Sequence, residues 1–215
     1  MSPTSSRPNT RITRLADRAS YDRETAYAIL DAALIAHLAV VVDGAPVVMP
    51  YVCARAGDEL VLHGSTRAGI LSAIAQGAPV SVAVTHVDGL VLARSAFHSS
   101  MNYRSVVIHG RARAVDDLAE KAQLLEAIAD HLTPGRRAVT RGMSDGELQA
   151  TQVLAIALDT FSAKIRTGGP IEPPEDRDPN VWAGVIPLAL TFGPAEADPT
   201  TPAHLAPPER RPAND

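Results

Sequence analysis

Short runs of aliphatic and β-branched residues, each bounded by turn residues, make up much of the chain. Residues 38–42 and 47–53 are two such runs, with Asp43-Gly44 between them. Because Asp-Gly readily adopts positive φ, this pattern predicts a β-hairpin. A second turn is predicted at Asp88-Gly89, and the remaining apolar runs predict strands over residues 59–63, 80–86, 90–93, 103–115, 151–158 and 161–166.

Apolar residues at helical spacing predict helices elsewhere in the chain. Asp22 can cap a helical pattern that extends to about residue 34, and the acidic pair Asp116-Asp117 opens another helix over about residues 117–131. Ser144 and Glu147 have the spacing of a capping box, which indicates a further helix start.

Six or seven strands in mostly antiparallel order, with helices between them, predict a mainly β fold with helices, of the α+β class. This order favours a small closed or nearly closed barrel, and no βαβ alternation supports a Rossmann sheet. With 215 residues and 46% hydrophobic composition, the chain can form one sizeable core. We expect one domain over residues 20–190, a flexible N-terminal tail over residues 1–19, and a disordered, proline-rich tail over residues 191–215.

The charge balance and the single cysteine limit the function classes. The net charge is −4 and the pI is about 6.0, so nothing in the composition favours nucleic acid. Cys53 is the only cysteine, which excludes an internal disulfide and favours a reducing compartment. The chain shows no secretory signal pattern, and no apolar run reaches the roughly 20 residues needed to cross a bilayer. We therefore expect a cytoplasmic protein with no membrane or nucleic-acid partner.

A dense group of hydrogen-bonding residues stands directly before the apolar part of the 103–115 strand. Asn102, Tyr103, Arg104 and Ser105 are costly to bury unless polar partners satisfy them. A ligand is one such partner. The alternative for Arg104 is an ion pair with one of the acidic residues of the chain.

A second polar segment follows the strand over residues 59–63, where the chain runs into Gly-Ser-Thr before a short helical pattern. Ser65 or Thr66 would cap this helix, and the backbone N–H groups, the hydroxyls and Arg67 could together bind a phosphate. The same residues also suit an ordinary capped turn, and no Walker or Rossmann pattern is present. His63 ends the strand beside this candidate anion site, where it could contact a ligand or have a structural role.

Two cations and one aromatic residue in the last third of the chain are further candidates. Lys164 and Arg166 alternate with apolar residues, so both lie on one face of the predicted strand, where they could bind an anion or form a solvated surface. Trp182 could be a core plug or a stacking platform. The seven histidines lack metal-ligand spacing, and no nucleophile elbow is present, so we expect neither a metal site nor classical hydrolase chemistry.

Six segments, in order over about residues 20–190, resemble one family. They are residues 44–51, 62–65, 88–92, 98–110, 162–168 and 182–188. The family is that of the pyridoxamine 5′-phosphate oxidase-related flavoproteins, in the branch that includes the nitroimidazole reductases. The resemblance implies a split β-barrel that binds FMN at the interface of a homodimer.

The resemblance also assigns side chains to the cofactor. One group would lie along the isoalloxazine ring, a second would hold the ribityl phosphate end, and a third would complete and close the site, in part from the neighbouring subunit. In that order they are Met49, Pro50 and Tyr51; His63, Ser65, Thr66 and Arg67; and Asn102, Tyr103, Arg104, Ser105, Lys164, Arg166 and Trp182. The Arg-x-x-Pro signature and the Glu-Phe-Trp run of the true oxidases are not present, so vitamin B6 oxidation is not expected.

An FMN-dependent oxidoreductase is the function that this resemblance implies. The flavin would accept a hydride from a reduced nicotinamide or another substrate and pass electrons to a small electrophile, while the protein positions the ring. His63 is the one side chain that we nominate to contact substrate. Two alternatives remain: a flavin-binding protein without catalytic activity, and the same barrel with a deazaflavin or haem in place of FMN.

Overall fold

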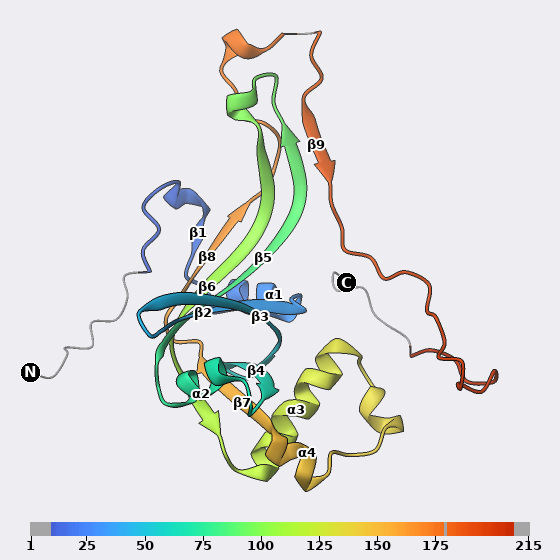
Figure 1. Ribbon diagram of the computed structural model, residues 1–215. Coiled ribbons are helices and arrows are strands. Elements are labelled where there is room, and N and C mark those ends of the chain that lie inside the picture. The colour runs from blue at the N-terminus through green and yellow to red at the C-terminus, as the bar shows by residue number, and fades with distance from the viewer. Residues whose placement is uncertain (1–9, 179, 209–215) are drawn as a thin grey trace, which may run out of the picture. The chain divides into compact units, whose positions relative to one another are not determined.

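The computed structural model describes residues 10–178 and 180–208, which contain nine strands and four α-helices (Figure 1). All strand pairs whose register is defined are antiparallel, which confirms the predicted mainly β class with helices. The described residues form two compact units. Unit 1 comprises residues 10–33, 82–109, 160–178 and 180–190, and unit 2 comprises residues 34–81, 110–159 and 191–208.

The predicted tails lie partly outside the described residues, since residues 1–9 and 209–215 belong to them. Within the N-terminal tail, residues 10–19 include the 3₁₀ helix Ala16–Arg18 and the start of strand β1 (Ala19–Ser20). Residues 191–208 contain turns but no helix or strand.

Unit 1 is built on the strand order β1-β8-β6-β5-β9. Strands β5 and β6 are long, and each continues from one unit into the other. Helix α1 (Arg23–Asp31) begins as predicted at Asp22, whose side chain accepts a hydrogen bond from the Thr25 backbone N–H. The strands of this unit are β1, β5 (Pro79–Leu92), β6 (Ser100–Val115), β8 (Phe161–Arg166) and β9 (Gly184–Pro187).

The turn predicted at Asp88-Gly89 is wrong, because β5 runs through both residues without a break. Gly89 lies where β9 pairs closely with β5, opposite Pro187. A Cβ atom at this position would lie 3.0 Å from the carbonyl oxygen of Ile186 and 3.0 Å from Cγ1 of Val185. The glycine therefore permits close approach of the two strands. From the sequence alone, a glycine with this role inside a strand cannot be distinguished from a glycine in a turn.

Unit 2 has the strand order β2-β3-β4-β7, with the second half of β6 beside β7. The predicted hairpin between β2 and β3 is confirmed, and Asp43 and Gly44 form its turn with φ values of 51° and 80°. The strands are β2 (Ile35–Val42), β3 (Ala45–Ala56), β4 (Glu59–Ser65) and β7 (Thr151–Ala157), and the helices are α2 (Gly69–Ala75), α3 (Leu118–Leu132) and α4 (Asp145–Ala150).

Two of the three helix starts in unit 2 agree with the sequence. Helix α3 follows the Asp116-Asp117 pair as predicted, with Asp117 as its N-cap residue, and Ser144 and Glu147 form the predicted capping box at α4. The predicted cap of α2 by Ser65 or Thr66 is wrong, because the N-cap residue is Ala68, which makes no side-chain cap. A turn comes first: the Ala68 N–H donates to the Ser65 carbonyl, so the helix begins three residues later than the pattern indicates.

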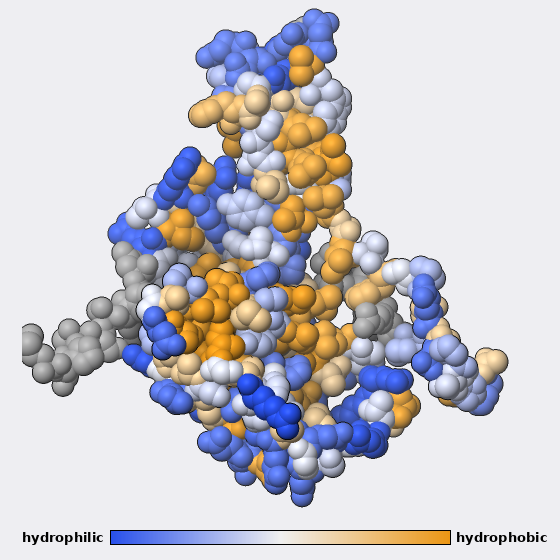
Figure 2. All heavy atoms as spheres, viewed as in Figure 1, coloured by the Kyte–Doolittle hydropathy of each residue, from blue (hydrophilic) through white to orange (hydrophobic). Residues whose placement is uncertain are grey.

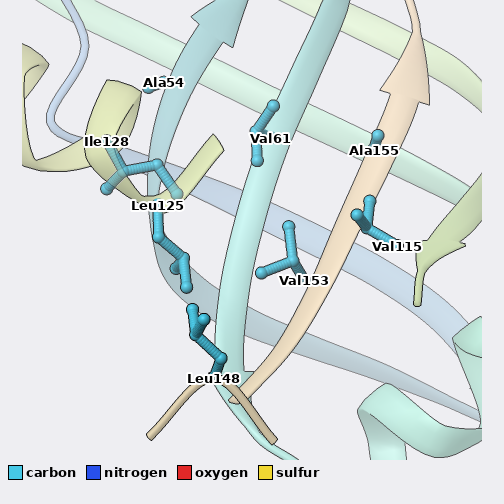
Figure 3. Packing of buried hydrophobic residues seen from close by; sticks show 8 residues of the cluster. All are labelled: Ala54, Val61, Val115, Leu125, Ile128, Leu148, Val153 and Ala155. Atoms are coloured by element: carbon cyan, nitrogen blue, oxygen red, sulfur yellow. The ribbon is translucent and has the colours of Figure 1, made fainter. Parts of the chain in front are cut away.

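The core of unit 2 lies between α3 and the strands β3, β4 and β7 (Figure 3). Leu125 and Ile128 of α3 pack with Val61 and Val153, all of them buried. Lys121 is also buried, and its ammonium group donates to the carbonyl oxygens of Leu148 and Thr151, at 3.3 and 3.0 Å. This lysine joins α3 to the last turn of α4 and the start of β7.

Replacing Gly89 with alanine should destabilise the protein by about 1–3 kcal/mol, because the methyl group would overpack against the backbone of β9. Urea unfolding followed by circular dichroism measures this change. Gly69→Ala is the matched control, since a Cβ at Gly69 meets nothing within 4 Å and the residue is helical, so its stability should be unchanged or slightly raised. Wild-type stability in Gly89→Ala would contradict the close approach of β5 and β9.

Candidate functional site

The side chains that the sequence assigns to a cofactor fall into two groups, one in each unit. The structure places the members of each group on neighbouring strands or at one strand end, except Trp182, which lies outside these strands in the segment that leads to β9. The unit 2 group is Met49, Pro50, Tyr51, His63, Ser65, Thr66 and Arg67, and the unit 1 group is Asn102, Tyr103, Arg104, Ser105, Lys164, Arg166 and Trp182.

The centre of the unit 2 group is the end of β4, where His63 pairs with Val153 of β7. The Nδ1 atom of His63 is buried and has no hydrogen-bond partner among the described residues. Burial lowers the pKa of this imidazole below its usual value, so the ring is neutral at pH 7. A buried nitrogen without a partner is uncommon in folded proteins and often marks a functional position.

Gly64 lets two side chains pack against the backbone beside His63. A Cβ at Gly64 would lie 2.6 Å from Cδ1 of Leu71 and 3.6 Å from Cε1 of Tyr51. The Tyr51 ring therefore lies next to the β4 backbone, and burial raises the pKa of its phenol. Tyr51 therefore lies on the face of β4 towards which Gly64 points, and His63 and Ser65, on either side of this glycine, point to the opposite face.

The next three residues differ in how many donors they have left for a ligand. Thr66 uses both its N–H and its hydroxyl to donate to the Ala150 carbonyl oxygen, at 3.1 and 3.2 Å. The Ser65 hydroxyl oxygen accepts from the Arg67 N–H at 3.2 Å, which leaves its own proton available. The Arg67 side chain is exposed and makes no ion pair or hydrogen bond within the described residues. Ser65 and Arg67 can therefore donate to an anion, whereas the Thr66 side chain is committed to the fold.

Met49 and Pro50 lie on opposite faces of β3. Met49 pairs with Leu38 of β2 and remains 41% exposed, and Pro50 pairs with the exposed His37. Cys53, further along the same strand, is fully buried, and burial raises the pKa of its thiol to about 12, as an inert core thiol requires.

In unit 1 the most unusual member is Arg166, which is only 5% exposed. Its guanidinium donates to Oδ1 of Asn102, to the Gly168 carbonyl at 3.2 Å and to the Gly169 carbonyl at 2.9 Å. Asn102 is itself buried and donates to the Gly168 carbonyl. All these partners are neutral, and Nε has none at all within the described residues.

The charge of Arg166 is therefore not balanced by a carboxylate in the part of the chain that the structure describes. Burial lowers the pKa of the guanidinium, repulsion from Arg18 lowers it further, and Tyr103 raises it. A buried, uncompensated cation of this kind favours an anionic group nearby.

Arg104, in contrast, has a carboxylate partner. Its Nε and one terminal nitrogen donate to the two carboxylate oxygens of Asp88, at 3.0 and 2.8 Å, and this hydrogen bonding raises the pKa of Arg104. The ion-pair alternative for Arg104 is thus present in the structure, and its contact with a flavin stays a prediction. Sequence reasoning missed Asp88 because it treated that residue as part of a turn.

The hydroxyl of Ser105 and the ammonium of Lys164 also have internal partners. Ser105 donates to the Lys164 carbonyl oxygen at 3.2 Å, and the Lys164 ammonium donates to the Arg14 carbonyl oxygen at 3.1 Å. Trp182 is 63% exposed and its indole packs against Gly184, so it does not plug the core.

Tyr103 lines an open pocket of about 560 Å³ whose other walls were not predicted from the sequence. Figure 2 shows hydrophobic residues gathered along β5, which forms much of this pocket. The lining residues are Thr85, Val87, Leu90, Val91, Leu92, Ser99, Ser100, Met101 and Tyr103. The alternating apolar residues of β5 predict a strand, and no further feature of the sequence indicates that they line a pocket.

The described residues contain no group of three or more His, Cys, Asp or Glu side chains arranged to hold a metal ion. Within the same residues, the helices are all too short or too polar to cross a bilayer.

The family model described as pyridoxamine 5′-phosphate oxidase matches residues 22–165. No curated protein gives a significant match.

Among solved structures, two similar ones cover almost the whole chain. The FAD and haem binding protein from Mycobacterium smegmatis is 40% identical, with a TM-score of 0.85, and the match covers 89% of this chain and 94% of that one. The flavocytochrome Anf3 from Azotobacter vinelandii is 38% identical, with a TM-score of 0.87 and 93% coverage of both chains.

A third structure shows the fold alone. It is a putative 5-nitroimidazole antibiotic resistance protein from Bacteroides thetaiotaomicron, 21% identical, with a TM-score of 0.59, and the match covers 68% of this chain and 86% of that one. Together the matches confirm the split β-barrel that the sequence predicted.

The burial of His63 predicts a loss of stability at acid pH. Because its folded-state pKa is lowered, the stability that it contributes is present in full above the unfolded-state pKa of about 6.5 and is lost as the pH falls through the folded-state pKa. His63→Gln should therefore reduce the dependence of the free energy of unfolding on pH between about pH 7 and pH 5. Urea unfolding at several pH values measures it, with the exposed His37→Gln as control. An unchanged pH dependence in His63→Gln would contradict a buried neutral imidazole.

Proposed function

Because the chain belongs to the pyridoxamine 5′-phosphate oxidase family, we propose that it is a flavin-binding redox protein and that it also holds haem. Both parts of this proposal follow the names of the two similar structures. One is an FAD and haem binding protein, and the other is a flavocytochrome, which is a protein with a flavin and a haem. The sequence analysis gave haem as an alternative to FMN, and we propose instead that the chain binds both a flavin and a haem.

The end of β4 supports the flavin proposal best. A flavin phosphate carries close to two negative charges and needs several donors, which the Ser65 hydroxyl and the Arg67 guanidinium can supply. The single observation that carries the proposal is the buried, unpartnered Nδ1 of His63 next to these open donors. Tyr51, beside Gly64, supplies the aromatic surface that a flavin ring requires.

These residues fit the phosphate that FMN and FAD share, and FMN remains our proposal for the form bound. When bound, the flavin supplies the hydride and electron transfer. The residues of the chain bind and orient it: Arg67 and Ser65 hold the phosphate, Tyr51 packs against the ring, and His63 contacts substrate with a neutral imidazole. We propose a reduced nicotinamide or another reduced substrate as donor and a small electrophile as acceptor.

Replacing Arg67 with alanine should weaken FMN and FAD binding by about ten-fold to a hundred-fold, since one charge-assisted hydrogen bond contributes about 1.5–3 kcal/mol. Quenching of flavin fluorescence on titration with the purified chain gives the dissociation constants. Arg141→Ala is the control, because Arg141 is an exposed arginine of the same unit whose partner is Glu147. Equal affinities of Arg67→Ala and Arg141→Ala would contradict a phosphate site at the end of β4.

We also propose that the chain forms a homodimer, and the outward face of the β2–β3 hairpin supports this. Cross-strand partners share a face of a sheet, and the pairs Ala39 with Val48 and Val41 with Pro46 put apolar residues there. Val41 is 62% exposed and Val48 is 58% exposed. Figure 2 shows hydrophobic residues gathered over this hairpin, and contiguous exposed apolar surface of this kind is typical of protein interfaces.

Introducing a charge into this face should separate the subunits. Val48→Glu should elute as a monomer in size-exclusion chromatography with light scattering, while wild type elutes as a dimer. The same substitution at Val139, which is 76% exposed but lies outside the hairpin, should leave the dimer intact. A dimer that survives Val48→Glu would place the interface elsewhere.

A further inference from the structure

The pocket of unit 1 is a second candidate binding site, separate from the phosphate donors that unit 2 supplies. Its volume of about 560 Å³ lies within the range of about 300–1,000 Å³ that is usual for sites of small molecules. Strands β5 and β6 form its walls, together with Ser99, which directly precedes β6. The pocket is therefore large enough for a small organic molecule.

Apolar side chains make up most of this lining. Val91 is fully buried, and three other large apolar residues remain partly exposed: Val87 at 43%, Leu90 at 38% and Met101 at 50%. Ile186 of β9 is the cross-strand partner of Leu90 and is also exposed, so it extends the apolar surface beyond the pocket (Figure 2). An apolar ligand in the pocket would remove these side chains from water, which is favourable.

Ligands that carry a carboxylate or a phosphate do not suit this lining. Burying such a group is costly unless a cation or several hydrogen-bond donors compensate its charge. None of the nine described residues that line the pocket is a lysine, an arginine or a histidine. The lining therefore favours an uncharged ligand over an anionic one of the same size.

Hydroxyl groups are the polar side-chain groups of the lining. The Ser99 hydroxyl already donates to one backbone group and accepts from another in the segment before β6. Thr85 and Ser100 are exposed, so water competes for their hydroxyls. Tyr103 is partly buried, and its hydroxyl makes no hydrogen bond to another described residue. Because a hydrogen bond is stronger where water is partly excluded, Tyr103 is the best donor to a ligand oxygen.

We propose that this pocket binds an uncharged, largely apolar carbonyl compound, such as an aromatic ketone or a quinone, whose oxygen accepts a hydrogen bond from the Tyr103 hydroxyl. The apolar residues of β5 and Met101 cover its rings. Tyr103 thus contacts this ligand in place of the flavin to which the resemblance assigns it. The site does not depend on the flavin proposal, because none of its lining residues belongs to the group at the end of β4.

Three naphthalenes of similar size test this proposal on the purified full chain. They are 2-acetylnaphthalene, which has a carbonyl oxygen, 2-naphthoate, which is anionic, and 2-ethylnaphthalene, which has no hydrogen-bond acceptor. Equilibrium dialysis gives the dissociation constants. Wild type should bind one 2-acetylnaphthalene per chain, about ten-fold more tightly than 2-naphthoate, because the lining cannot compensate a carboxylate.

Two variants of the lining separate the hydrogen bond from the apolar contact. Tyr103→Phe should weaken binding of 2-acetylnaphthalene about two-fold to ten-fold and leave that of 2-ethylnaphthalene unchanged, because only the ketone accepts a hydrogen bond. Met101→Lys adds a cation to the lining and should bind 2-naphthoate more tightly than 2-acetylnaphthalene. Met143→Lys is the control, because Met143 is 39% exposed and lies outside the pocket, so it should behave as wild type.

The preference of wild type for the ketone does not depend on whether any variant folds. Equal affinities for 2-acetylnaphthalene and 2-naphthoate, or binding of neither, would overturn the proposal. Displacement of the bound ketone by one equivalent of hemin would assign the pocket to haem and overturn it as well. Equal losses for the ketone and for 2-ethylnaphthalene in Tyr103→Phe would overturn the role of the hydroxyl. Flavin affinity should be unchanged in all three variants, so the flavin proposal is tested separately.

Discussion

The pairing of β6 with β8 is the constraint on which the chemistry of unit 1 depends. Their antiparallel hydrogen bonds fix Tyr103 opposite Arg166 and Ser105 opposite Lys164, and a slip of one residue would move each of these side chains to the other face. The same register brings Asn102 within reach of Arg166, and the chain that follows β8 supplies the Gly168 and Gly169 carbonyls. A buried arginine is thus held by neutral oxygens alone, and its charge remains available to a bound anion.

In unit 2 the corresponding constraint is the end of β4, where the strand stops and the chain turns towards α2. The turn commits Thr66 to the Ala150 carbonyl and leaves the donors of Ser65 and Arg67 open. His63 has a buried nitrogen without a partner at this point, so the fold pays a desolvation cost that a bound ligand could offset. The open donors at the end of β4 belong to unit 2, and the apolar pocket lined by Tyr103 belongs to unit 1.

Much of the fold follows from local signals in the sequence. Asp22 and Ser144 cap the helices that they were expected to cap, Asp116-Asp117 precede the helix that they were expected to open, and Asp43-Gly44 forms the expected turn. These effects act within a few residues. Gly89 was misread because its role depends on β9, almost a hundred residues later in the chain. Local patterns cannot report a contact of that range.

The candidate site likewise depends both on local residue types, which the sequence shows, and on long-range contacts, which it does not. The sequence identified which residues carry hydrogen-bonding groups, but not which of these groups are already satisfied. The Asp88 carboxylate neutralises Arg104, and no carboxylate among the described residues neutralises Arg166, a difference that depends on tertiary contacts. The apolar pocket beside Tyr103 likewise forms only when β5 and β6 lie together.

The visible absorption spectrum of the purified protein, taken before and after addition of FMN or FAD and of hemin, tests the central claim most directly. The account predicts the bands of a bound flavin together with a Soret band, each from one cofactor per chain. A protein that is colourless and that neither flavin nor hemin can reconstitute would contradict it.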